Sequence, residues 1–266
     1  MLCYDAMVMN NTSGKKRGSV TKAAVVLIWI VLWAAAARVV NLPVLLPGPL
    51  ATVRKLIVLM QESAFWSSVA LSFVRIGLGY LIAVILGVLF AILCTAYAAA
   101  DALFSPLRTL IRSTPISSII ILVLLWLDIE TVPLFIVSLT VLPIVWQNVQ
   151  EGIKEVDPLL LEMADAYHLS EKKRMAAIWI PSVMPYFYTA CATSIGFAWK
   201  AGIAAEVIAK PMHSIGRNLQ DAKVYLNTDE LFAWTLAVVL LSLILERLLR
   251  RSMLGRREGL GHADHQ

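Results

Sequence analysis

Long apolar runs without a charged side chain alternate with short polar segments along this chain. Residues 76–100, 131–150 and 175–199 contain no Asp, Glu, Lys or Arg. Each run has the roughly 20 residues that an α-helix needs to cross about 30 Å of hydrocarbon. Shorter apolar runs at 23–37, 113–127 and 231–245 reach that length with their flanking residues, because long basic side chains can extend to the membrane surface. Since a membrane span must satisfy its own backbone hydrogen bonds, the pattern predicts an all-α, multi-pass membrane protein with about six spanning helices.

Composition supports a membrane protein over a soluble one. Hydrophobic residues make up 59% of the chain and charged residues 15%, with a mean hydropathy of +0.75. Soluble proteins carry about a quarter charged residues. We therefore expect a transmembrane domain over residues 22–251. A polar N-terminal tail over 1–21 and a cytoplasmic C-terminal tail over 252–266 are expected to flank it.

Basic residues concentrate in alternate connecting segments. Cytoplasmic connections of membrane proteins carry an excess of Lys and Arg, so this distribution predicts that both termini and the 151–181 segment are cytoplasmic. Contact with an anionic lipid bilayer accounts for the net charge of +5 without nucleic acid. The alternative, a cleaved signal peptide at 23–37, is disfavoured because Arg38 follows the run and no soluble domain begins there. The residues on the predicted inner side are Lys15, Lys16, Arg17, Lys22, Arg108, Arg112, Lys154, Lys172, Lys173, Arg174, Arg247, Arg250, Arg251, Arg256 and Arg257, against Arg54, Lys55, Lys210, Arg217 and Lys223 on the outer side.

The 151–181 segment is polar and longer than a simple connection between spans requires. Asp157 followed by Pro158 is a favourable helix start, with a side-chain acceptor at the N-cap and proline in the first turn. We expect a helix over 158–167 and a second short helix that begins after Ser170 and continues into the span near Pro181. Two such helices predict a compact projection that binds a partner outside the membrane.

The same segment resembles the coupling loop of permease subunits of ATP-binding-cassette (ABC) importers. That loop carries Glu-Ala-Ala, three residues, Gly, nine residues, and aliphatic-x-aliphatic-Pro. Met163 replaces the first alanine and His168 replaces the glycine, although histidine adopts a left-handed conformation more readily than branched residues do. The matching residues are Glu162, Ala164, Ile178, Ile180 and Pro181.

Three further segments, 46–49, 112–115 and 196–206, resemble the nitrate/sulfonate/taurine branch of these permeases. The resemblance implies the type I importer permease fold, a permease homodimer in a prokaryotic cytoplasmic membrane, cytoplasmic ATPase subunits and an extracytoplasmic solute-binding protein. It implies a small solute such as a sulfonate, nitrate, taurine or a pyrimidine-type vitamin precursor. It also implies that Glu162 contacts the ATPase, that the small Ala164 lets the projection seat closely, and that Pro181 fixes the angle with the next span.

This sequence has no Gly-x-x-x-x-Gly-Lys-Ser/Thr motif, so it lacks that phosphate-binding loop. ATP and Mg²⁺ are therefore expected on the partner ATPase, with no cofactor or metal on this chain. A stand-alone secondary carrier is the nearest alternative. A membrane enzyme is a more distant one, because no cluster of catalytic residues is apparent.

Three charged residues, Arg75, Lys200 and Glu206, lie in or at the edge of predicted spans. A charge at the bilayer centre costs about 2.5–3.5 kcal/mol on translocon insertion scales, so each needs a partner or a water-filled cavity. One interpretation places them in a translocation path, where Lys200 or Arg75 meets an anionic or polar solute. The other is an ion pair between helices, such as Arg75 with Glu206, that stabilises the bundle.

Overall fold

The computed structural model describes residues 24–261, with side chains described up to Leu248, and all its regular elements are helices. The predicted N-terminal tail over 1–21 lies outside the described residues, and so do residues 262–266 of the predicted C-terminal tail. The rest of that C-terminal tail, residues 252–261, belongs to α11. The elements are Ala24–Val40, α2 (Pro49–Gln61), α3 (Ser63–Ala96), α4 (Ala98–Ser113), α5 (Ile116–Val123), α6 (Val132–Lys154), α7 (Pro158–Ala166), α8 (Glu171–Arg174), a π-helical turn (Met175–Trp179), α9 (Ile180–Ala209), α10 (Ile215–Val224) and α11 (Thr228–Gly261).

Three helices within the described range, α3, α6 and Thr228–Leu248 of α11, are long and apolar enough to cross a membrane. The helix Ala24–Val40 is apolar but shorter, and α4 with α5 forms a bent pair that brings the number to four if it counts as one span. The 30-residue α9 carries polar residues along its length and falls below the same apolarity. The predicted all-α fold with several long apolar helices is confirmed, and the number of six spans stays a prediction.

The prediction of a span over 113–127 is wrong in its length. The structure gives the eight-residue α5, which lies at 103° to α4. Eight residues of α-helix rise only about 12 Å. Pro115 explains the break, because proline disfavours the helical conformation of the preceding residue, and Thr114 is extended with φ −82° and ψ 132°.

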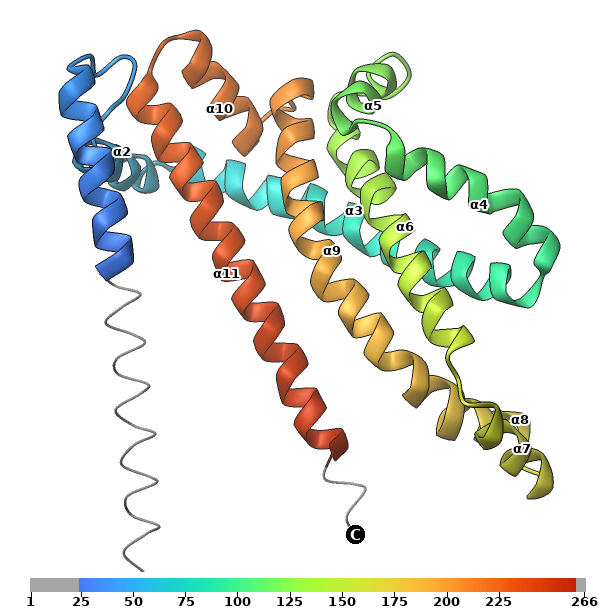
Figure 1. The fold of residues 1–266 in the computed structure, drawn as a ribbon. Coiled ribbons are helices and arrows are strands. Elements are labelled where there is room, and N and C mark those ends of the chain that lie inside the picture. The colour runs from blue at the N-terminus through green and yellow to red at the C-terminus, as the bar shows by residue number, and fades with distance from the viewer. Residues whose placement is uncertain (1–23, 262–266) are drawn as a thin grey trace, which may run out of the picture.

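The core forms where α3, α6 and α9 pack together, and Figure 1 shows α3 crossing behind the other two helices. Glycines permit this close approach. A Cβ at Gly79 would lie 2.5 Å from the Leu134 carbonyl oxygen, and one at Gly87 would lie 2.9 Å from Val145 Cβ. Gly202 of α9 meets Ile76 of α3 in the same way, at 2.5 Å. These small residues therefore set the spacing of the central helices.

The two ends of the bundle carry different elements. Helices α7 and α8 lie at one end, where α11 also finishes, and α10 and the connection between Ala24–Val40 and α2 lie at the other (Figure 1). Which end faces the cytoplasm stays a prediction from the distribution of basic residues. We refer to the end with α7 and α8 as the α7 end, and to the other as the α10 end.

Candidate functional site

Helix α7 begins as the sequence predicts. The Asp157 side chain accepts a hydrogen bond from the Leu159 backbone N–H at 2.9 Å, and Pro158 occupies the first turn. Because the first N–H groups of a helix have no partner within it, this cap stabilises the start by about 1 kcal/mol. Ser170 stands at the N-cap of α8, but its side chain makes no capping hydrogen bond.

His168 ends α7 in a left-handed conformation, with φ 51°. The His168 N–H donates to the Asp165 carbonyl at 3.0 Å, and the Leu169 N–H donates to the Ala164 carbonyl at 2.9 Å. This pair of bonds is the Schellman motif, which normally has glycine at the left-handed position. The turn geometry is therefore kept despite the replacement of glycine.

Ala164 is buried inside the projection, with 1% of its surface exposed. It packs with Val156 and Ile178, and Leu161 and Leu169 cover this small cluster. The structure therefore changes the role expected for Ala164. Its small size lets α7 lie against the chain that leads into α9, and the side chain has no surface left to offer a partner.

The outer face of α7 is exposed and mixes charge with large apolar side chains. Glu162 is exposed, and Leu159, Met163 and Tyr167 are 65%, 55% and 75% exposed. The three apolar residues recur at intervals of four and so share one helix face. A group of exposed apolar side chains at the end of the bundle is typical of a protein-binding surface.

The projection joins α9 through uninterrupted helix. α8, the π-helical turn and α9 follow one another from Glu171 to Ala209. The Ile180 N–H donates to the Met175 carbonyl, five residues earlier, just before Pro181, which has no N–H to give. Ile178 is buried, and Ile180 is exposed. Arg174 pairs with Asp165 of α7, and its Nη1 lies 3.5 Å from Glu171 Oε1.

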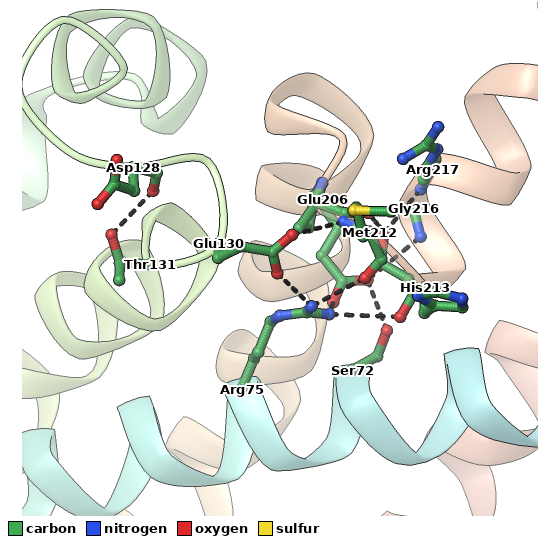
Figure 2. A network of polar contacts seen from close by, with 12 residues as sticks. Ser72, Arg75, Asp128, Glu130, Thr131, Glu206, Met212, His213, Gly216 and Arg217 are labelled. Carbon is green, nitrogen blue, oxygen red and sulfur yellow. Dashed lines mark hydrogen bonds and ion pairs between the residues drawn. The ribbon is translucent and has the colours of Figure 1, made fainter.

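A second group of polar residues surrounds Glu206, near the α10 end (Figure 2). The Glu206 side chain is fully buried. Its Oε2 accepts a hydrogen bond from Ser72 Oγ at 2.8 Å and another from the Gly216 N–H at 3.2 Å. Arg75 Nη1 lies 3.8 Å from Oε1, so the charge of the carboxylate is compensated.

Arg75 connects this carboxylate to a second one. Its Nη2 pairs with Glu130 and donates to the Met212 carbonyl at 2.9 Å, while Nη1 donates to the His213 carbonyl at 3.4 Å. Glu130 also accepts from the Met212 N–H at 2.7 Å. The network ties α3, the start of α6, α9 and the 210–214 loop together. Glu130 could not be identified from the sequence, because a lone glutamate before an apolar run does not reveal its partner.

Lys200 lies apart from this network. It is exposed on α9, and no ion pair to it occurs among the described residues. Thr193 and Phe197 are also exposed at helical spacing on the same face. The three charges thus divide: Arg75 and Glu206 form the ion pair between helices that was one of the two interpretations, and Lys200 is exposed outside that pair.

Comparisons with known proteins agree on one kind of protein. Residues 79–252 match the family model described as "Binding-protein-dependent transport system inner membrane component". The taurine transport system permease protein TauC of Escherichia coli (strain K12) is 25% identical over 236 residues, which cover 86% of this chain and 84% of TauC. The putative aliphatic sulfonates transport permease protein SsuC of Bacillus subtilis (strain 168) is 24% identical over 259 residues, covering 94% and 92%.

A third relative is the bicarbonate transport system permease protein CmpB of Synechocystis sp. (strain ATCC 27184 / PCC 6803 / Kazusa). It is 26% identical over 189 residues, which cover 71% of this chain and 67% of CmpB. Among solved structures, a crystal structure of an amino acid ABC transporter with histidines matches with a TM-score of 0.59 and 18% identity. The match covers 73% of this chain and 94% of that one. At this identity the likeness shows the fold alone.

Proposed function

We propose, because the chain belongs to the family of binding-protein-dependent transport system inner membrane components, that two copies of it form the translocation path of an importer driven by separate ATPase subunits. As a member of this family, the chain is a membrane-spanning permease subunit of an ABC transporter. Its role is transport, and ATP hydrolysis is assigned to the partner. The α7 end, with both termini, faces the cytoplasm in this proposal.

One observation carries the coupling step: an exposed helix face is joined to a central helix of the bundle by continuous helix. Glu162, Met163 and Tyr167 would contact the ATPase. The hydrogen-bonded turn at His168 and the cluster around Ala164 keep α7 in place. Movement of the ATPase subunits would then pass through the π-helical turn and Pro181 into α9, and alter access to the path.

The solute of this permease is proposed to be a small anion or acid. The relatives named above transport taurine, aliphatic sulfonates or bicarbonate by their printed names. Lys200 offers an exposed positive charge on a helix of the bundle. A binding protein would deliver the solute at the α10 end, near the 43–49 turn and the 210–227 segment.

The test is ATP-driven uptake by the permease reconstituted in proteoliposomes with its ATPase and binding protein. Glu162→Lys, or deletion of residues 161–169, is expected to abolish uptake while the permease still inserts and purifies as the wild type does. Glu155→Lys is the matched control, since Glu155 is exposed in the same segment but lies outside α7. Uptake retained in the Glu162→Lys variant and in the deletion would disprove the coupling role.

A further inference from the structure

A cavity of about 380 Å³ lies between the break of α4 and α5, the middle of α6 and the exposed face of α9. Its polar lining consists of Arg112, Thr114, Thr140 and Thr193, and Phe197 provides an aromatic wall. Aliphatic residues and Pro143 complete it. Binding sites for small molecules start at about 300 Å³, so this cavity suits a small solute.

The positive charge at this cavity has no carboxylate to balance it. Arg112 donates to Gln147 Oε1, a neutral group, and forms no ion pair within the described part of the chain. Lys200 follows Phe197 by one turn on the same face of α9 and also has no acidic partner there. Arg75, in contrast, is paired with two carboxylates. An anion is the ligand that this imbalance attracts.

The threonine hydroxyl groups of the cavity indicate which hydrogen-bonding groups the ligand carries in addition to its anionic group. Thr140 donates its proton to the Ile136 carbonyl at 2.7 Å, and Thr193 donates to the Thr189 carbonyl at 2.8 Å. Thr114 likewise donates to the Leu110 carbonyl at 2.8 Å. A hydroxyl has one proton and two lone pairs, so with its proton directed at the helix each of these presents lone pairs that accept a hydrogen bond from a ligand. A ligand with N–H or O–H donors matches this arrangement.

We infer that this cavity binds the transported solute, and that the solute is a small organic anion which also carries N–H or O–H donors. Arg112 contacts the anionic group, Thr140 and Thr193 accept from the donors, and Phe197 packs against the ligand's carbon atoms. The inference rests on the proposed function, because it assigns the solute site of that transporter. It narrows the proposed solute to an amino-sulfonate, or to another small acid that carries N–H or O–H donors.

The charge preference can be measured without knowing the solute. Thr193→Cys is placed in a background of Cys3→Ser, Cys94→Ala and Cys191→Ala, and the complete transporter is treated with two thiol reagents of similar size. One is sulfonatoethyl methanethiosulfonate, an anion, and the other is its trimethylammonium counterpart, a cation. The anionic reagent is expected to react roughly tenfold faster, because the local charge is positive. Arg112→Gln should bring the two rates close together.

Thr189→Cys is the matched control, one turn away on the same helix face and outside the cavity lining. It should react without a comparable dependence on Arg112. The inference is overturned if Thr193→Cys reacts with neither reagent, if the cation reacts as fast as the anion, or if Arg112→Gln changes nothing. Labelling needs no uptake, so its failure and a failure of ATP-driven transport are separate results.

The donor requirement has its own measurement. Taurine and ethanesulfonate share the sulfonate group, and only taurine has an amino group. Taurine is expected to protect Thr193→Cys from labelling at lower concentration than ethanesulfonate, and Thr140→Val should reduce that difference. Equal protection by the two compounds, or none by either, would overturn the assignment of the ligand class.

Discussion

The Arg75 guanidinium of α3 lies 3.8 Å from the fully buried Glu206 carboxylate of α9. Ser72 and the Gly216 N–H hold the other oxygen of that carboxylate at 2.8 and 3.2 Å. A buried carboxylate without such partners would be strongly unfavourable, whereas a paired and hydrogen-bonded one is tolerated. The pair therefore fixes the α10 ends of two central helices relative to each other, and to the loop that leads into α10.

Removal of Glu206 should destabilise the protein more than removal of Glu130. Glu206→Ala leaves Ser72 and the Gly216 N–H without their buried acceptor and Arg75 without one of its two carboxylates. Breaking a buried pair costs on the order of 3 kcal/mol. Glu130 is half exposed, so solvent screens the loss of its pair with Arg75, and Glu130→Ala should cost less than a third of that. Thermal unfolding of the purified permease in detergent measures both. An equal loss for the two variants would show that Glu206 is not the buried anchor.

Gly216→Ala adds a single methyl group, yet it should destabilise the protein. A Cβ at this position would lie 2.3 Å from Glu206 Cβ and 2.4 Å from the Val207 nitrogen, so α10 and α9 would have to separate. We expect a loss of about 1–3 kcal/mol in the free energy of unfolding. Gly196→Ala is the control, because no atom lies within 4 Å of its Cβ and alanine favours the helix. The same unfolding experiment should find Gly196→Ala neutral or stabilising.

His168→Gly should stabilise α7 slightly without loss of transport. Relief of the left-handed histidine is worth about 1 kcal/mol, partly offset by the entropy of glycine. His168→Val should have the opposite sign, since a β-branched residue resists a positive φ. Amide hydrogen exchange over residues 158–169 reports both effects. Faster exchange in His168→Gly than in the wild type would contradict the turn described here.

Two substitutions in α7 should separate packing from partner binding. Ala164→Leu places a larger side chain in the cluster with Val156 and Ile178, and should destabilise the projection by about 1–3 kcal/mol. Tyr167→Ala removes an exposed side chain, so it should leave hydrogen exchange of the segment unchanged and weaken ATPase binding. Affinity for the ATPase subunit, measured with the detergent-purified permease, distinguishes them. Unchanged affinity in Tyr167→Ala would remove this face from the interface.

Local signals made parts of the structure predictable from the sequence. The Asp157–Pro158 start of α7 depends on neighbouring residues alone, and the structure reproduces it. Apolar runs located the long helices, because hydrophobicity over some 20 residues depends little on tertiary contacts.

Features that depend on distant parts of the chain were not predictable in the same way. The sequence motif suggested a partner contact for Ala164, and only the packing of α7 against Ile178 reveals the side chain as internal. The pairing of Arg75 with Glu206 was one of two interpretations that the sequence left open, and the structure shows it. The part played by Glu130 required the folded arrangement.

The central claim is that this permease works only with an ATPase acting through α7. Uptake of radiolabelled solute into proteoliposomes that contain the permease and its binding protein, with and without the ATPase subunits, tests it most directly. The account predicts uptake only when both the ATPase and ATP are present on the α7 side, and loss of that uptake in Glu162→Lys. Solute accumulation by the permease without any ATPase subunit would contradict the account and indicate a stand-alone carrier.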